Sequence, residues 1–153
     1  MGVNKKRTII SLLFLVTISF FFVAFHRGGD SYLNYPKTIT NINGRSLNLY
    51  IADTEKRQEQ GLGGVKSLKD DSGMFFKFAN EDFWSIWMKD MFIPIDVLWL
   101  NEKHEVVYIV PNMRPEDYPH IYTPSTLSKY VIEVNKGFVE KNSIKVGQKF
   151  YIE

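Results

Sequence analysis

Hydrophobic and polar residues alternate along several short stretches of the chain, which is the pattern of half-buried β-strands. Two such stretches, residues 37–42 and 46–51, flank the dipeptide Asn43-Gly44. Both residues of this dipeptide tolerate the positive φ angles of a type I′ turn. The pattern therefore predicts a β-hairpin at the start of the folded part of the chain.

Further segments of β character follow, and they outnumber the helical ones. Their close spacing and the turn residues between them favour an antiparallel sandwich or barrel. A short helical turn is expected at residues 138–142. The expected strands comprise residues 73–78, 82–89, 95–100, 105–110, 130–135 and 148–152.

One short helix is expected at residues 54–60. Asp53 can cap it by accepting hydrogen bonds from the first turn, and Gly61 can end it. The glycine-rich stretch that begins at Gly61 predicts a bend, and the chain up to residue 72 has the character of a surface loop. Four prolines between residues 111 and 128 predict a long irregular loop, a kind of segment that is usually functional or mobile.

The N-terminus has a different pattern, because Lys5, Lys6 and Arg7 precede the uncharged residues 8–25. A helix of that length spans about 27 Å, close to the roughly 30 Å of a bilayer core. No good signal-peptidase site follows, because Phe22 stands two places before Ala24. We therefore expect an uncleaved single-pass anchor in the cell membrane, with the N-terminus in the cytoplasm and the domain outside. Secretion after signal cleavage is the alternative.

This division gives residues 1–30 as a basic stub and transmembrane anchor, 31–36 as a tether and 37–153 as a single extracytoplasmic β domain. Without the anchor region, Lys and Arg fall from 19 to 15, and Asp and Glu fall from 17 to 16. The remaining domain carries a net charge of −1, so nucleic acid is not an expected partner. The chain has no cysteine, so no disulfide can stabilise the domain.

The densest candidate site is the block of residues 86–96, in which Lys89, Asp90 and Asp96 interrupt an apolar run beside Trp87. In the functional interpretation these charges converge in a pocket beside Trp87, under the proline-rich loop. In the structural interpretation Asp90 caps a turn, and Lys89 pairs with a carboxylate such as Glu133. The pattern favours the structural interpretation, because turns and ion pairs often serve shape alone.

Glu133 is the second candidate, because it lies between Ile132 and Val134 in a predicted strand and points to the opposite face from both. If that face borders a cleft, Glu133 is a candidate base or ligand anchor. In a two-layer β fold that face is more often solvent-exposed. No metal or other cofactor is expected, because the three histidines lack the short spacings of metal ligands and no phosphate-binding glycine loop occurs.

The chain carries a set of motifs at residues 52–57, Gly61-Leu62, residues 73–78, 86–96 and 131–135, and the glycines 137 and 147. Together these motifs resemble DUF192, an uncharacterised family of exported or membrane-anchored proteins, over residues 38–152. The resemblance implies a compact β-sandwich of jelly-roll character with one short helix, and no established activity. The sequence departs from the family pattern at Gly63, where methionine is usual, and at Asp90, where asparagine is frequent.

Three hypotheses on function follow. The first is a non-catalytic module that binds a ligand or an envelope protein through the face bearing Lys89, Asp90 and Asp96. The second is a hydrolytic enzyme on a cell-surface polymer, with Asp90, Asp96 or Glu133 as acid and base. The third is a structural subunit of a membrane complex. Two carboxylates with separated pKa values in one pocket would favour the enzyme.

Overall fold

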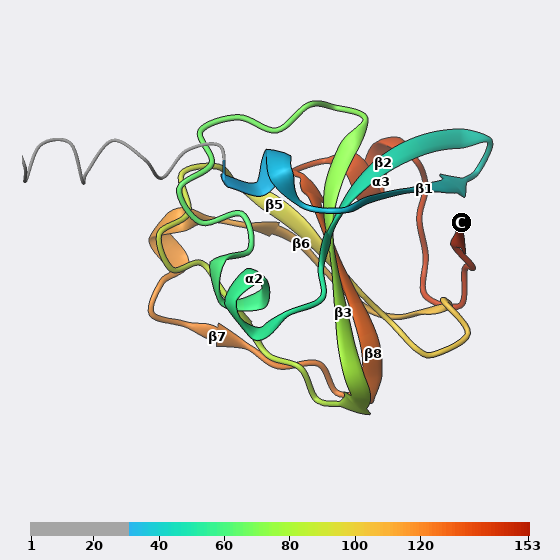
Figure 1. Ribbon diagram of the computed structural model, residues 1–153. Helices are drawn as coiled ribbons and strands as arrows, with labels where there is room; N and C mark the ends of the chain where they lie inside the picture. Colours follow the sequence, from blue (N-terminus) through green and yellow to red (C-terminus); the bar gives the residue numbers. More distant parts are fainter. Residues whose placement is uncertain (1–30) are drawn as a thin grey trace, which may run out of the picture.

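The computed structural model describes residues 31–153, and the proposed stub and anchor lie outside the described residues. A large mixed β-sheet forms the body of the domain, with the strand order β6-β5-β8-β3-β2-β1-β9 (Figure 1). A two-stranded sheet, β4-β7, lies apart from it. The strands are β1 (Lys37–Ile42), β2 (Arg45–Ala52), β3 (Ser72–Asp82), β4 (Ile86–Trp87), β5 (Ile95–Leu100), β6 (Val106–Met113), β7 (Ile121–Tyr122), β8 (Ser128–Asn135) and β9 (Tyr151–Ile152).

Short helices connect these strands. The α-helices are α2 (Glu55–Gln60) and α3 (Phe138–Lys141), and the 3₁₀ helices are η1 (Ser31–Asn34) and η2 (Pro115–Asp117). No helix in the described part of the chain has the length and apolar character needed to cross a membrane.

The mainly β fold is confirmed, but the expected antiparallel sandwich or barrel of jelly-roll character is not what forms. β2 and β3 run parallel, with Tyr50 opposite Met74, while the other neighbours in the large sheet are antiparallel. Parallel neighbours need a crossover connection, and α2 with the loop that follows it supplies one. The sheet order ends in β6 on one side and β9 on the other, so no continuous ladder closes a barrel.

The predicted hairpin at Asn43-Gly44 is confirmed, since β1 and β2 pair around these two residues, whose φ angles are 51° and 75°. The expected cap of α2 is wrong by one residue. Thr54 is the N-cap and accepts from the Arg57 N–H, whereas Asp53 forms an ion pair with Arg57 at 2.6 Å. Gly61 ends the helix as expected.

The expected strand at residues 82–89 is wrong, because β3 continues to Asp82 and β4 comprises two residues only. A register irregularity between Lys77 and Asp82 interrupts the pairing of β3 with β8. Beyond it the chain forms a separate ribbon in which Trp87 lies opposite Ile121 of β7. The proline-rich segment is therefore less irregular than expected, since it contains the end of β6, η2 and β7.

Two hydrophobic clusters cover the two faces of the large sheet. On β8, Val131 belongs to one cluster, and Ile132 and Val134 belong to the other. Phe138 of α3 and Phe150 complete the second cluster. Three residues of the loop after α2 complete the first, so this loop is an internal cover and not the expected surface loop. These residues are Leu62, Val65 and Leu68.

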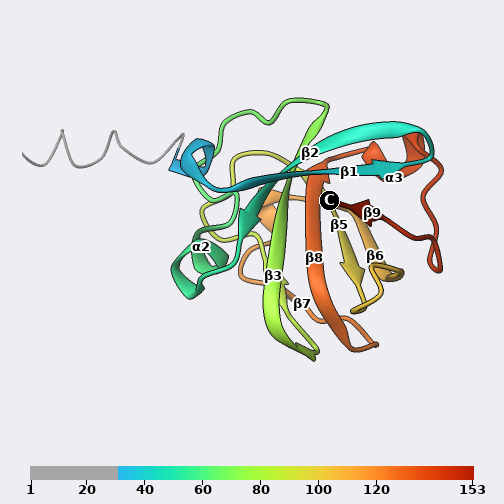
Figure 2. The same ribbon diagram turned by 45° about the vertical axis from the view of Figure 1, so that its right-hand side comes forward.

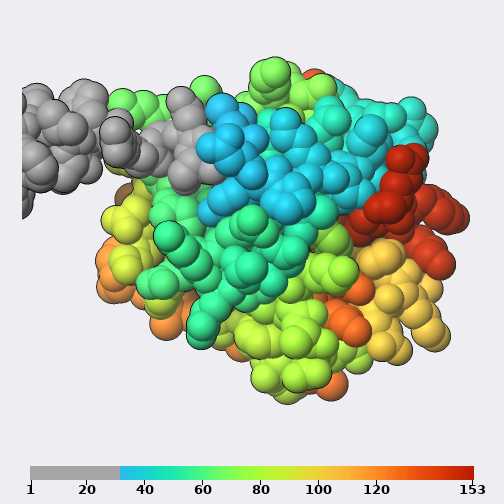
Figure 3. Space-filling view, viewed as in Figure 1, coloured from blue at the N-terminus to red at the C-terminus, as the bar shows by residue number. Residues whose placement is uncertain are grey.

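Both ends of the described chain pack onto this body. Tyr32 of η1 is buried and contacts Tyr50 edge-to-face at 4.8 Å, so the segment expected to be a tether contributes to the core. η1 and α2 lie on the same face of the molecule (Figure 3). At the other end, β9 pairs with β1, and the Phe150 N–H donates to the His104 carbonyl beside β6 (Figure 2).

Candidate functional site

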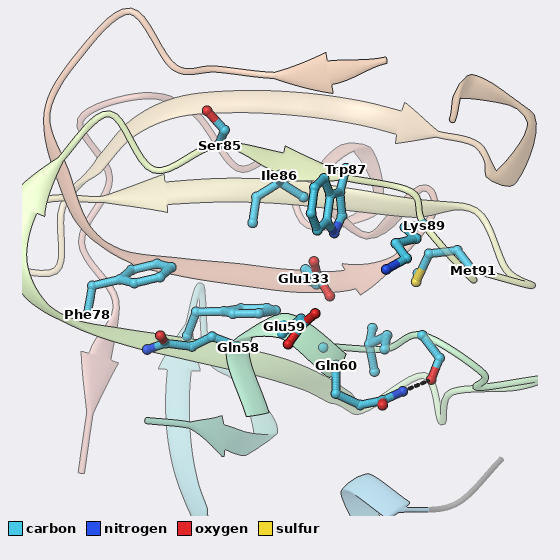
Figure 4. Close-up of a pocket in the computed structure, with 14 residues that line it drawn as sticks. Gln58, Glu59, Gln60, Phe78, Ser85, Ile86, Trp87, Lys89, Met91 and Glu133 are labelled. Atoms are coloured by element: carbon cyan, nitrogen blue, oxygen red, sulfur yellow. Dashed lines mark hydrogen bonds between the residues drawn. The ribbon is translucent and has the colours of Figure 1, made fainter. Parts of the chain in front are cut away.

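A pocket of about 130 Å³ lies between α2, the loop after it, and strands β3, β4 and β8 (Figure 4). Its walls are mainly apolar and aromatic, and its polar groups come from α2, β8 and the chain just after β4. The side chains that define it are Gln58, Phe76, Phe78, Trp87, Lys89 and Glu133.

Glu133 provides the floor of this pocket. It lies in the middle of β8, opposite Met74 of β3 and Val97 of β5, and only 4% of its surface is exposed. In Figure 4 its carboxyl group points into the space between Trp87 and the residues of α2. The solvent-exposed position expected for this side chain is therefore wrong, because the loop after α2 covers that face of the sheet.

The Oε2 atom of Glu133 is buried and has no hydrogen-bond partner. Among the described residues, only one other buried side-chain oxygen or nitrogen lacks a hydrogen-bond partner, namely Oδ1 of Asn112 on β6. An unsatisfied buried polar atom costs about 1–3 kcal/mol, so its persistence calls for an explanation. A ligand group that reaches Oε2 would supply the missing hydrogen bond.

Burial raises the pKa of Glu133 from the usual 4.5 to about 8. Desolvation favours the uncharged form of a carboxyl group, and no cation offsets it here. The only ion pair within residues 31–153 joins Arg57 of α2 to Asp53, and neither residue lines the pocket. The carboxyl group of Glu133 is therefore mostly protonated at neutral pH.

Gly61 keeps the floor of the pocket open. Its φ of 48° is a conformation that side chains disfavour, and a Cβ atom there would lie 3.1 Å from Cζ of Phe76. The same Cβ would lie 3.7 Å from Oε2 of Glu133. The Gly-Leu motif therefore both ends α2 and leaves room beside the carboxyl group.

Trp87 and Lys89 form the mouth of the pocket. Trp87 is 44% exposed, and Nζ of Lys89, also exposed, lies 5.8 Å from the centroid of its indole ring. Deeper in, Phe78 stacks on Trp84 with ring centroids 4.0 Å apart. The site thus combines a carboxyl floor, aromatic walls and one ammonium group at the entrance.

The structure brings three of the five candidate residues together, namely Trp87, Lys89 and Glu133. Asp90 instead lines a neighbouring hollow of about 300 Å³ together with Lys56, Glu59 and Lys89, and its backbone has a φ of 58°. The predicted buried pairing of Lys89 is wrong, because its side chain is exposed and forms no ion pair with any described carboxylate. The cap expected from Asp90 is also absent; its carbonyl accepts the Gly64 N–H instead.

Asp96 lies outside the pocket, so the expected convergence of Lys89, Asp90 and Asp96 does not occur. It is 1% exposed, and its two oxygens accept the N–H groups of Asn112 and Val139, each at 2.9 Å. These bonds fasten the end of β6 and the start of α3 to β5. The role visible in the structure is therefore structural.

The sequence patterns did not single out the contribution of α2 and β3 to the site. Gln58 belongs to the helix expected at residues 54–60, and Phe76 and Phe78 belong to the strand expected at residues 73–78, but none of the three was proposed as a site residue. The glycine-rich bend after α2 was the available signal, because such a bend allows the chain to fold back over the sheet. The proline-rich loop does not line the pocket. Its strand β7 pairs with β4, which does line it. No three acidic or histidine side chains within residues 31–153 are placed to hold a metal ion.

Two crystal structures resemble this fold. A protein of Sinorhizobium meliloti 1021, whose description proposes a role in transcription regulation, has a TM-score of 0.72 at 26% identity, and the match covers 77% of this chain and 95% of that one. A protein of unknown function from Novosphingobium aromaticivorans DSM 12444 has a TM-score of 0.69 at 28% identity, with 76% and 83% covered. No curated protein sequence matches this one. The profile of DUF192, described as an uncharacterised ACR, matches residues 38–152, and the chain therefore belongs to the DUF192 family.

Proposed function

We propose that the domain is a non-catalytic ligand-binding module of the cell envelope, with the pocket above Glu133 as its binding site. The observation that carries this proposal is the buried Oε2 atom without a partner, which points into a cavity with an exposed entrance. Pockets that bind small molecules commonly combine apolar walls with a few polar groups that fix orientation.

The size of the pocket limits the ligand. A buried cavity of roughly 150 Å³ is large enough to hold benzene. The present pocket has a comparable volume of about 130 Å³, so we expect it to take one ring-sized group. Any larger part of the ligand would lie over the exposed face of Trp87.

The proposed location depends on the N-terminal segment. Residues 8–25 are apolar and follow a basic cluster, which supports a single-pass anchor with the domain outside the cell membrane. In that arrangement the domain would meet ligands or protein partners of the envelope.

A hydrolytic enzyme is the second candidate, since a carboxyl group that is protonated at neutral pH suits a general acid. The pocket holds a second carboxylate, Glu59 of α2, but it lies at the exposed rim, and the other expected acidic residues support the binding module instead. Asp90 and Asp96, the expected acid-base partners of Glu133, do not line the pocket. Hydrolysis of cell-surface glycans by the wild-type protein, abolished in Glu133→Gln, would favour the enzyme.

The binding proposal can be tested by identifying small molecules that co-purify with the full-length protein from native membranes. We expect a bound compound in wild type and in the control Glu140→Gln, which alters an exposed carboxylate of α3. Glu133→Gln and Trp87→Ala should release it. Retention of the same compound by both pocket variants would contradict the proposal.

A further inference from the structure

We propose that this pocket selects an organic ammonium group on a ring-sized body, with the ammonium hydrogen-bonded to Glu133. The inference deepens the proposed binding function and rests on it. The proposed ligand belongs to one chemical class, the organic ammonium ions.

The two side-chain amides that line the pocket already donate within the chain, and the ammonium group of Lys89 lies at its exposed mouth. Nε2 of Gln58 donates to the carbonyls of Ala52 and Lys77, at 3.4 and 2.9 Å. Nε2 of Gln60 donates to the Gly63 carbonyl at 2.6 Å. The floor, in contrast, offers the Oε2 atom of Glu133 without a partner. A ligand that fits this imbalance brings donors, and an ammonium group brings three and no acceptor.

The walls also suit a cation. Phe76, Phe78 and Trp87 present aromatic rings to the cavity, and the thioether of Met91 lies beside them. The face of an aromatic ring attracts ammonium groups through its quadrupole. One such ammonium group of the chain already lies over an aromatic ring of the pocket, since Nζ of Lys89 is 5.8 Å from the Trp87 ring centroid.

The charged groups around Glu133 do not occupy the position of the ligand. Its strand neighbours, Met74 on β3 and Val97 on β5, are uncharged. The charges at the rim are Glu59 on α2 and Lys89 after β4, both exposed and of opposite sign. An anionic ligand would bring a second acidic group beside the buried carboxyl group, and the one cation that lines the pocket, Lys89, lies at its exposed rim, so an anion is less favoured at the floor.

Binding of the ammonium group would be coupled to a proton. Burial raises the pKa of Glu133 to about 8, so the carboxyl group is mostly neutral at pH 7. When the cation enters, the carboxyl group loses its proton to water and becomes the anionic partner of the ammonium. Below pH 8 the affinity should therefore rise about tenfold with each pH unit, and about one proton should be released per ligand bound.

Three probes that share one ring can test the inference: benzylammonium, benzyl alcohol and benzoate. Calorimetric titration of the full-length protein in detergent, between pH 6 and pH 8, would measure affinity, and buffers of different ionisation enthalpy would measure proton release. We expect benzylammonium to bind at least tenfold more tightly than the other two probes. Its affinity should rise with pH as described.

Three variants test which residues the binding of benzylammonium and the release of the proton depend on. Glu133→Gln should weaken benzylammonium binding at least tenfold at pH 8 and abolish proton release. Trp87→Ala, which changes an exposed side chain, should weaken binding but preserve proton release. Glu140→Gln should behave as wild type.

The inference is overturned if benzylammonium does not bind at millimolar concentration, if benzoate or benzyl alcohol binds as tightly, or if its affinity is constant from pH 6 to pH 8. Unchanged binding in Glu133→Gln would overturn it as well. None of these outcomes contradicts the broader binding function, which fails only when a co-purifying compound remains bound to both pocket variants.

Discussion

Two buried carboxyl groups in this domain differ in how their oxygens are satisfied. Asp96 accepts a backbone N–H on each oxygen, and these hydrogen bonds replace water. Glu133 has one oxygen without any partner, in a space that a ligand can enter. The carboxyl group of Asp96 stabilises the fold, whereas the unsatisfied oxygen of Glu133 lowers its stability.

The cost at Glu133 should appear as a pH dependence of stability. The folded protein holds this proton up to about pH 8, whereas the unfolded chain loses it near the usual pKa of 4.5. The free energy of unfolding should therefore fall as pH rises between these values, by roughly 1.4 kcal/mol per unit at most, and several kcal/mol in all. Chemical denaturation from pH 5 to pH 8 would measure the slope.

Glu133→Gln should lack this contribution, because its amide does not titrate. At pH 8 the free energy of unfolding of the variant should approach or exceed that of wild type. Toward pH 5 it should be lower than that of wild type. Glu140→Gln, at an exposed position, should keep the wild-type slope. An equal slope in Glu133→Gln would show that another group is responsible.

Asp96→Ala should be strongly destabilising. It removes the acceptor of two backbone N–H groups in the interior, and each buried donor left without a partner costs about 1–3 kcal/mol. We expect a loss of about 2–5 kcal/mol in urea denaturation. Asp90→Ala, six residues earlier in the chain and exposed, should cost about 1 kcal/mol or less. A small effect of Asp96→Ala would mean that water replaces the carboxylate.

Lys89→Ala and Lys89→Met should each change stability by less than about 1 kcal/mol, since the side chain is exposed and has no ion pair among the described residues. Their main effect should be on events at the mouth of the pocket. Denaturation of both variants at neutral pH would measure this. A loss of about 3–5 kcal/mol would instead point to a buried pair.

For single residues, the sequence predicted to which face of the sheet the Glu133 side chain points, but not what lies on that face. Strand alternation shows that its side chain leaves the sheet opposite to Ile132, yet only the folding of a distant loop decides whether water or protein lies there. The error at Lys89 has the opposite cause. The segment around Lys89 is largely apolar, but β4 comprises only two residues, and beyond it the side chain of Lys89 is exposed while that of Met88 is buried.

Among the elements, local signals were reliable and pairing between distant strands was not. The hairpin and the end of α2 follow from single turn residues, Asn43-Gly44 and Gly61. The parallel pairing of β2 with β3 depends on a crossover made of a short polar helix and a loop, and neither part reveals which strand edge it leads to. The residues expected to form one strand over 82–89 comprise the last residue of β3, the irregular residues 83–85, the two residues of β4 and the two residues that follow it.

Gly73, at the start of β3, shows how tightly the central strands are packed. A Cβ atom there would lie 2.7 Å from the Glu133 carbonyl, closer than real Cβ contacts allow. Gly73→Ala should therefore push β3 away from β8 and cost more than about 2 kcal/mol, measured by chemical denaturation.

Gly147→Ala is a matched control for this change. A Cβ atom at Gly147 would meet nothing within 4 Å, so the substitution bears only the backbone strain of a φ of 89°. We expect it to cost about 1 kcal/mol. Equal effects of the two substitutions would show that β3 and β8 can separate without penalty.

For the whole molecule, the open question is whether residues 1–25 remain part of the mature protein. We expect that they do, because no good cleavage site follows the apolar stretch and the basic cluster should hold Met1 in the cytoplasm. The intact mass of the protein extracted from membranes would measure this directly. Protease added outside intact cells should digest the C-terminal domain. A new N-terminus near His26 would indicate secretion instead.

The two edges of the large sheet bear on the behaviour of the molecule at high concentration. At one edge β9 has two residues, too short to template another strand. At the other edge β6 contains Pro111, which has no N–H to offer, and its pairing with β5 is interrupted by register irregularities. Short, kinked or proline-bearing edges are how β-proteins avoid adding strands from neighbouring copies. We therefore expect the domain to resist polymerising strand by strand, even if the expected N-terminal anchor concentrates many copies on one membrane surface.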